Sequence, residues 1–371
     1  MHIKDTFRKY LEEAIGCDKA LVAFFVFDEP AKVSVRMNPF KDGVMPEGVS
    51  VPWNEYGRLL PERPKFTLDP HFHGGAYYVQ DSSSMFVGHV FRKLLNDMTG
   101  PVRVLDLCAA PGGKTTDLAA SLREAFGDAF VLVSNEVMKQ RAAVLADNAA
   151  IWGDPNVIVP SDDPRAFSSL PGFFDIVVAD VPCSGEGMFR KDEQAVRDWS
   201  LQNVDLCWRR QRDILESVWP TLKPGGLLVY STCTFNRYED EDNVQWIAEQ
   251  LGAEVLQVSV CPEWNIHGEY HFLPGRIRGE GQYMALLRKN GEASSVRNSI
   301  KTDKEKAGKA EPLALQQWVE GDCQFFIHKE AYHAFPAEYA NQLAMLRTRL
   351  NLLVAGVQLA VPKGKDWQPA H

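Results

Sequence analysis

The sequence predicts an α/β protein whose main domain is doubly wound, with a smaller domain on each side. Three observations lead to this fold. Short apolar segments alternate with helical segments from residue 102 to residue 288, which is typical of a parallel sheet covered by helices on both faces. A glycine-rich turn follows the first apolar segment. Two later segments each run into a cysteine, Cys183 and Cys233.

The expected elements of the main domain follow one another in regular alternation. Strands are expected at 102–107, 129–134, 156–160, 174–180, 227–231, 254–260 and 282–288. Helices are expected at 86–95, 115–126, 139–152, 204–222 and 239–251. The strands are short, apolar and bounded by turn residues, as strands buried on both faces are. The turn Lys223-Pro224-Gly225-Gly226, for example, introduces the run 227–231.

Residues 1–90 are expected to form an N-terminal domain. A helical pattern at 7–15, an apolar run at 20–27 and an alternating segment at 33–39 precede a proline-rich stretch at 46–70, which we expect to be irregular. The aromatic and basic side chains of that stretch suit stacking and phosphate contacts with single-stranded RNA. Taken alone they favour a structural role. Together with the chemistry inferred below, they lead us to expect an RNA-binding domain.

The main domain, residues 91–290, is followed by a polar segment at 291–311 that is predicted to be a flexible linker. Residues 312–371 contain apolar segments and are predicted to form a small C-terminal domain that binds RNA. About sixty residues is small for an independent core. Because the sequence stops soon after a strand-like segment, we expect this domain to be truncated.

Composition and charge exclude several classes of protein. A chain of 371 residues with 45% hydrophobic residues can bury a full core. No apolar run approaches the ~20 residues that span a bilayer, and the first residues do not resemble a signal peptide. We therefore expect a cytoplasmic protein without a membrane partner, and a monomer. The net charge of −9 argues against indiscriminate coating of nucleic acid, which depends on phosphate neutralisation.

A local basic groove is compatible with this net charge. The candidate cations for such a groove are Arg36, Lys41, Arg58, Arg63, Lys65, Arg190, Lys191, Arg276 and Arg278. For any one of them, a solvated surface charge is the more common explanation.

The cysteines predict neither a disulfide scaffold nor a metal site. They are seven in number, widely scattered and without a C-x-x-C pair: Cys17, Cys108, Cys183, Cys207, Cys233, Cys261 and Cys323. Both a disulfide framework and a zinc site would show more regular spacing.

The glycine-rich turn, residues 106–116, follows a strand and opens a helix. Its glycines allow a ligand to approach the backbone, and the start of the helix offers free N–H groups. A Walker A loop would need a glycine in place of Cys108, and the dinucleotide pattern G-x-G-x-x-G is also absent. Glu136 lies just past the second strand, where an acid can hold ribose hydroxyls, although a solvated loop charge is the usual explanation for a lone glutamate. Lys114, taken alone, is a surface residue at a helix start.

Two cysteines and an aspartate are expected at one edge of the sheet. The strand 174–180 ends in Asp180 and runs into Val181-Pro182-Cys183, and the strand 227–231 runs into Cys233. If the two strands are parallel neighbours, these side chains meet at the carboxyl edge, where open α/β sheets bind ligands. A lone buried cysteine is usually inert, so the prediction of a reactive site depends on two cysteines lying at the same edge.

With these motifs the chain resembles the RNA 5-methylcytosine methyltransferases of the Nop2/Sun family, and within it the enzymes of bacterial 16S ribosomal RNA. The matching segments are 106–116, 134–136, 180–187 with 190–192, and 231–234, with weaker similarity at 36–38, 78–81 and 279–281. The similarity covers most of residues 20–290. The Pro-Cys and Thr-Cys motifs are specific as a pair.

The resemblance implies a Rossmann-like methyltransferase domain with S-adenosylmethionine as the methyl donor. The residues implied to bind it are Cys108, Ala109, Ala110, Pro111, Gly112, Gly113, Lys114, Glu136, Asp163 and Asp180. Asp163 is preferred to Asp162 because it precedes Pro164-Arg165, which resembles the Asp-Gly-Arg of the family. The proline in place of glycine departs from that pattern.

The resemblance also implies a reaction at C5 of cytosine in RNA, with 16S rRNA or the small ribosomal subunit as the partner. Cytosine C5 is a poor nucleophile, so the Cys233 thiolate is expected to add to C6 first. Asp180 is expected to supply a proton or hydrogen bond at N3 if its pKa is raised. Cys183 is expected to assist release of the product, and Lys114 to steady charge nearby and help lower a thiol pKa.

Other functions stay open at this point. In a DNA cytosine methyltransferase the Pro-Cys thiol, here Cys183, would be the nucleophile. An amino-group methyltransferase would place an aromatic residue at that position. The substrate could also be transfer RNA, or the chain could be a non-catalytic RNA-binding assembly factor.

Overall fold

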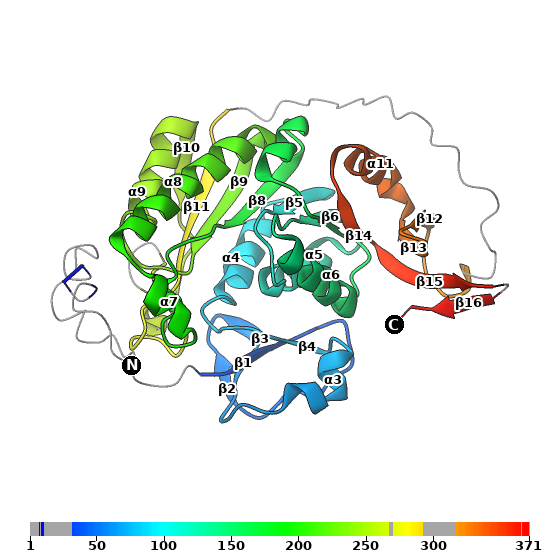
Figure 1. Cartoon of the computed structure of the whole chain (residues 1–371), viewed down its shortest axis with the longest axis horizontal. Coiled ribbons are helices and arrows are strands. Elements are labelled where there is room, and N and C mark those ends of the chain that lie inside the picture. Colours follow the sequence, from blue (N-terminus) through cyan, green and yellow to red (C-terminus); the bar gives the residue numbers. More distant parts are fainter. Residues whose placement is uncertain are drawn as a thin grey trace.

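The computed structural model of the protein describes residues 7, 9, 10, 32–266, 270–291, 316–364 and 366–370. Within these residues the strands form three sheets (Figure 1), of which the central one has eight strands in the order β10-β11-β9-β8-β5-β6-β7-β14. The doubly wound α/β architecture expected from the sequence is confirmed. None of the described helices is long and apolar enough to cross a membrane.

The middle of the central sheet is parallel and its edges are antiparallel. The parallel strands are β5 (Val102–Asp106), β6 (Phe130–Ser134), β7 (Val157–Pro160), β8 (Phe174–Asp180) and β9 (Leu222–Thr232). The antiparallel strands are β10 (Ala253–Leu256), β11 (Tyr283–Lys289) and β14 (Leu352–Ala355). Successive side chains of a strand enter opposite cores, as the twofold period of a strand requires: Ile176 packs in one hydrophobic cluster and Val177 in the other.

Helices cover both faces of this sheet. One core contains apolar side chains of α4 (Phe86–Leu95), α5 (Gly113–Phe126) and α6 (Lys139–Trp152). The other contains side chains of α8 (Leu201–Val218), α9 (Glu241–Trp246) and α11 (Ala340–Arg349). The helix expected at 204–222 therefore ends earlier, and β9 begins at Leu222. A short helix, α7 (Glu193–Asp198), precedes α8.

The N-terminal sheet has the order β2-β3-β1-β4 and is antiparallel where its strands pair. Its strands are β1 (Ser34–Met37), β2 (Val49–Val51), β3 (Asn54–Leu59) and β4 (Tyr77–Val79), and a short helix, α3 (Pro70–His73), precedes β4. The expectation of an irregular stretch at 46–70 was wrong, because Pro52 lies in the turn between β2 and β3 instead of breaking a strand. The helical pattern at 7–15 lies largely, and the apolar run at 20–27 wholly, outside the described residues.

The C-terminal segment contributes to two sheets. Four of its strands form a small antiparallel sheet in the order β12-β13-β15-β16: β12 (Cys323–His328), β13 (Ala331–Pro336), β15 (Val357–Lys363) and β16 (Asp366–Pro369). Between them, β14 pairs with β7 of the central sheet, with Ala355 opposite Ile158. The expected separate domain at 312–371 is thus corrected, since part of it completes the main sheet. The expected linker at 291–311 falls, apart from Gly291, outside the described residues.

Candidate active site

Two thiols meet at the carboxyl edge of the central sheet. Strands β8 and β9 are parallel neighbours with Asp180 opposite Ser231, so the segments after them lie side by side. The Sγ atoms of Cys183 and Cys233 are 2.8 Å apart, and the backbone N–H of Cys233 donates to Cys183 Sγ at 3.2 Å. The hydrogen bond to Cys233, together with removal from solvent, raises the pKa of Cys183 well above its usual value. Either thiol can donate the hydrogen bond between the two sulfurs.

A charged pair lies at the same edge. Lys114, in the first turn of α5, donates from Nζ to Oδ2 of Asp180 at 2.7 Å. The other carboxylate oxygen of Asp180 accepts from the Ser231 hydroxyl, also at 2.7 Å. Two expected site residues, Lys114 of α5 and Asp180 of β8, are thereby connected, while Ser231 of β9, which was not assigned a role from the sequence, holds the orientation of the Asp180 carboxylate.

The glycine-rich turn joins β5 to α5 in a form suited to ligand binding. Gly112 is the N-cap of α5, has a φ of 113°, and no side chain caps the helix. A positive φ is accessible to glycine at little cost, and the uncapped N–H groups face outward from the helix start. The turn is fixed to the next strand end because Ala109 N–H donates to the carbonyl of Asn135 at 2.8 Å.

Glu136 is buried beside this turn with one oxygen unsatisfied. Its Oε1 accepts from the Met138 N–H at 2.9 Å, whereas its Oε2 is buried and accepts no hydrogen bond from any residue that the structure describes. The nearest cation to Oε2 is Arg141, at 3.3 Å, which also donates to the carbonyl of Ala110 at 2.9 Å. An acceptor left open in this position is what a hydroxyl-bearing ligand would satisfy.

Asp163 makes its contacts within its own loop. Its carboxylate caps the following short 3-10 helix, η2 (Pro164–Ser169), and pairs with Arg165, whose hydrogen bonds lower the pKa of Asp163 to about 2. Neighbouring Asp162 accepts from the Asn351 N–H. Asn135 connects this segment to the rest of the edge, since its Nδ2 donates to the carbonyls of Leu107 and Asp162. The assignment of Asp163 to a ligand stays a prediction, and Asn135 is a residue that sequence reasoning missed.

The nine cations considered for a basic groove do not all lie in one place in the structure. Arg36 is fully buried and donates to Gln80 and Thr116, so it joins the N-terminal sheet to α5 and is not part of a groove. Lys41 donates to the backbone carbonyls of Gly74 and Ile151. Four others, Arg63, Arg190, Lys191 and Arg278, line two hollows on one side of the molecule.

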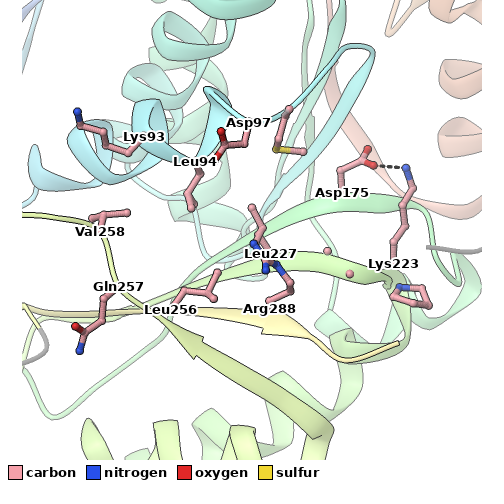
Figure 2. A pocket seen from close by; sticks show the side chains of 14 residues that line it. Lys93, Leu94, Asp97, Asp175, Lys223, Leu227, Leu256, Gln257, Val258 and Arg288 are labelled. Carbon is pink, nitrogen blue, oxygen red and sulfur yellow. Dashed lines mark hydrogen bonds and ion pairs between the residues drawn. The ribbon is translucent and has the colours of Figure 1, made fainter. Parts of the chain in front are cut away.

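A further hollow of about 450 Å³ lies at the opposite edge of the sheet and is not part of this site (Figure 2). Its walls include Asp175 at the start of β8 and Lys223 at the start of β9, which form an ion pair. The thiols follow the other ends of the same strands. At about 3.3 Å per residue, the seven residues of β8 separate the two edges by roughly 20 Å.

Comparison with known proteins is consistent with this geometry. The sequence profile of the family described as 16S rRNA methyltransferase RsmB/F matches residues 94–288, and that of the N-terminal domain of 16S rRNA methyltransferase RsmF matches residues 3–82. Ribosomal RNA small subunit methyltransferase F of Enterobacter sp. (strain 638) is 30% identical to this chain over an alignment of 406 positions, gaps included. The alignment covers 98% of this chain and 81% of the relative. The protein of the same name from Klebsiella pneumoniae is 35% identical over 73% of this chain and 61% of its own length.

Solved structures share the fold. A methyltransferase homolog protein from Pyrococcus horikoshii superposes with a TM-score of 0.60 at 24% identity, covering 77% of this chain and 100% of that one. NSun6 from Pyrococcus horikoshii, solved with SFG, superposes with a TM-score of 0.51 at 25% identity, covering 62% of this chain and 57% of that one.

Proposed function

The chain belongs to the RsmB/F family of 16S rRNA methyltransferases, and on that premise we propose that it methylates C5 of a cytosine in 16S rRNA through a covalent adduct with Cys233. The observation that carries this proposal is the contact between the Cys183 and Cys233 thiols, 2.8 Å apart at the ends of adjacent parallel strands. A reaction that requires both a nucleophile and a second proton-transferring group at one carbon–carbon double bond needs two such groups side by side.

S-adenosylmethionine is the methyl donor of this family, and the residues present fit it. The uncapped start of α5 and the glycine turn offer backbone N–H groups to a polar ligand, and the open Oε2 of Glu136 can accept from a ribose hydroxyl. When bound there, the cofactor supplies the methyl group. The backbone of residues 108–114 and the Glu136 carboxylate would hold it, while the Lys114 side chain is paired with Asp180.

Cys233 is proposed as the nucleophile because it stands in the Thr-Cys motif, to which the family resemblance assigns the attack on C6. Cys233, after losing its thiol proton to solvent, forms a bond from its sulfur to C6 of cytosine, and the electron pair of the C5–C6 double bond shifts so that C5 becomes electron-rich. N3 takes up a proton during this addition. Asp180, whose carboxylate accepts from Lys114 and Ser231, would relay that proton to N3 from the Lys114 ammonium. C5 can then accept a methyl group.

Cys183 is proposed to serve the final step. After methylation, C5 carries both a methyl group and a hydrogen. Removal of that proton by Cys183, acting as a thiolate, returns the electron pair to the C5–C6 double bond and expels the Cys233 sulfur. Once Cys233 is bonded to carbon, its hydrogen bond to Cys183 is lost. That bond is the largest of the causes that raise the pKa of Cys183, so its loss favours release of the Cys183 proton to solvent before this step.

Bisulfite mapping tests the proposed function. The purified protein is incubated with S-adenosylmethionine and in vitro transcribed 16S rRNA, and with transfer RNA as the competing substrate. We expect one or more cytosines of 16S rRNA to become resistant to deamination with the wild-type protein and not with Cys233→Ala. Methyl incorporation without bisulfite resistance would place the methyl group at another atom, and resistance in transfer RNA alone would reassign the substrate.

A further inference from the structure

Two adjoining hollows run along the boundary between the N-terminal sheet and the main domain. One, of about 400 Å³, is lined by residues that include Lys32, Arg63 and Lys191. The other, of about 690 Å³, is lined by residues that include Lys32, Arg190 and Arg278. They share Lys32, and Arg190 and Lys191 are consecutive. We call the pair of hollows the boundary groove.

The boundary groove is positive although the chain as a whole is negative. Its lining contains five cations and two carboxylates, those of Glu47 and Asp81. Arg190 is held by Glu280 at 2.9 Å and Lys191 by Asp81 at 2.8 Å.

The remaining three cations of the groove are exposed and have no ion pair within the part of the chain that the structure describes: Lys32, Arg63 and Arg278. Each is therefore available to a phosphate.

Two wall segments of the groove pack beside Cys233. Gly187, between Cys183 and Arg190, donates its N–H to the carbonyl of Cys233 at 2.9 Å. Its Cα lies so close to Gly281 that a β-carbon would collide with the carbonyl oxygen of that residue. The segment carrying Cys183 and the segment carrying Arg278 are thus in direct contact beside Cys233.

We propose that the boundary groove holds the phosphates of single-stranded RNA next to the target nucleotide, with Lys32, Arg63 and Arg278 as the contacting cations. This rests on the proposed function for the identity of the ligand as RNA. Arg190 and Lys191 are fixed by their carboxylate partners and shape the walls.

Salt-dependent RNA binding tests this proposal. The triple variant Lys32→Gln, Arg63→Gln, Arg278→Gln is compared with a control that removes equal charge from exposed positions on α4 and α8, Lys93→Gln, Arg209→Gln, Arg210→Gln. The probe is in vitro transcribed 16S rRNA without turnover. Since each phosphate contact on a single strand contributes about 0.7 to the slope of log K against log salt, we expect the slope of the triple variant to be shallower by about 2. Affinity for S-adenosylmethionine should be unchanged.

An unchanged slope in the triple variant, or an equal change in the control, overturns the proposal that the boundary groove holds RNA phosphates. The result is independent of methylation chemistry. If the triple variant shows the expected shallower slope but the wild-type protein leaves all cytosines unmodified, the proposed function fails while RNA binding in the boundary groove is supported.

A second inference concerns a buried carboxylate that joins the two segments carrying the thiols. Glu186 has no exposed surface, and four donors converge on it. Its Oε2 accepts from the Thr234 hydroxyl at 2.6 Å and from the Phe235 N–H at 3.3 Å. Its Oε1 accepts from Trp199 Nε1 at 3.1 Å and from Asn236 Nδ2 at 3.2 Å. Only a side chain whose two terminal atoms both accept hydrogen bonds, such as a carboxylate, satisfies all four donors.

These contacts cross from one cysteine segment to the other. Glu186 lies three residues after Cys183, and Thr234 directly follows Cys233. A second contact runs in parallel, because the Ser184 hydroxyl and the Thr234 hydroxyl are 3.2 Å apart. We infer that Glu186 is a positioning residue that fixes the Cys233 thiol against the Cys183 thiol.

The spacing of the thiols is measured by their own oxidation. Diamide, reduced to its hydrazine, converts two adjacent thiols to a disulfide, and the rate of Cys183–Cys233 linkage reports how often the sulfurs meet. We expect Glu186→Gln to slow both this linkage and kcat by about tenfold or more, with cofactor affinity retained. Glu193→Gln, an exposed glutamate on α7, is the matched control.

Thr234 provides the check that keeps this inference testable if Glu186→Gln folds poorly. Thr234→Val removes the donor to Glu186 at nearly constant shape, whereas Thr234→Ser keeps it. Loss of linkage rate in the valine variant with rescue by serine supports the positioning role. Equal rates in wild type, Glu186→Gln and Thr234→Val overturn it.

Discussion

Lys114 and Asp180 form a 2.7 Å ion pair that connects the start of α5 to the end of β8. The two side chains are 11% and 30% exposed, so solvent reaches the pair only in part. The turn proposed to hold the methyl donor and the carboxylate proposed to face the base are therefore connected directly. A change at Lys114 should be felt in chemistry more than in cofactor binding.

The first prediction tests this connection. Lys114→Met removes the charge and the donor to Asp180 while keeping an unbranched chain of similar length. Loss of proton-transfer assistance typically costs ~10²-fold or more, so we expect kcat to fall by about that factor. Calorimetric affinity for S-adenosylmethionine should change much less. Lys93→Met, exposed on α4, is the control, and a fall confined to cofactor affinity would contradict the assignment.

The second prediction separates the two thiols. Cys233→Ala should abolish turnover and any covalent complex, because no bond to C6 can form. Cys183→Ala should allow addition and methylation but stall release, leaving the protein attached to RNA. The measurement is a denaturation-resistant protein–RNA band on a gel with unmodified RNA and cofactor.

The double cysteine variant should show no such band, and Cys207→Ala, a buried cysteine on α8, should behave as wild type. A band with Cys233→Ala and none with Cys183→Ala would exchange the two roles and favour the mechanism of DNA cytosine methyltransferases.

The third prediction concerns Glu136. Its open Oε2 is buried, so hydroxyl contacts made there would be worth about 1–3 kcal/mol. Glu136→Ala should weaken binding of S-adenosylmethionine accordingly in calorimetry, while Glu124→Ala on α5 serves as the control. An unchanged affinity would remove Glu136 from the ribose site.

The fourth prediction uses a buried carboxyl at the end of β5. Burial raises the pKa of Asp106 to about 7, above its usual 3.8, so the folded protein holds a proton there that the unfolded chain has lost. Its contribution to stability is present below about pH 4 and is lost as the pH rises to about 7. Between about pH 4 and pH 7, the free energy of unfolding of the wild-type protein should therefore fall by roughly 2–4 kcal/mol more than that of Asp106→Asn.

Urea unfolding of both proteins between pH 4 and pH 8 measures this difference. Asp97→Asn, at an exposed aspartate, is the control. Parallel stability curves for wild type and Asp106→Asn would show that Asp106 is charged in the folded protein.

The fifth prediction concerns the C-terminal segment, for which RNA binding stays a proposal. Deletion of residues 312–371 removes β14 and the α11 side chains Leu343 and Leu346 from the second core, so we expect a lower melting temperature and loss of cofactor as well as RNA affinity. A sharper test leaves the core intact. Lys329→Glu with Lys363→Glu, both exposed, should weaken RNA binding and leave cofactor binding unchanged. Unchanged RNA affinity would count against the role.

The elements that the sequence predicted well are specified locally. Apolar runs of five to seven residues between turns identify β5, β6 and β8, and the order of elements along the chain then requires a parallel sheet. The meeting of Cys183 and Cys233 followed from that arrangement, because parallel strands share their carboxyl edge.

The features that sequence reasoning missed depend on pairing between distant segments. The burial of Arg36 depends on Gln80 and Thr116, and the role of Glu186 depends on Thr234 and Trp199. Each looks like a surface charge in its own neighbourhood. The β2–β3 hairpin was hidden for another reason: its proline occupies a turn, where the missing N–H costs nothing.

The pairing of β14 with β7 has a consequence for how the protein is made. Residues 352–355 complete a sheet whose partner strand is residues 157–160, so the outer side of β7 stays unpaired until the ribosome has released most of the chain. An open strand edge is a site of intermolecular pairing, and contacts between such distant residues form slowly. Nascent or truncated chains that lack β14 are accordingly the forms most prone to aggregate, and a chaperone that shields the edge of β7 would act during that interval.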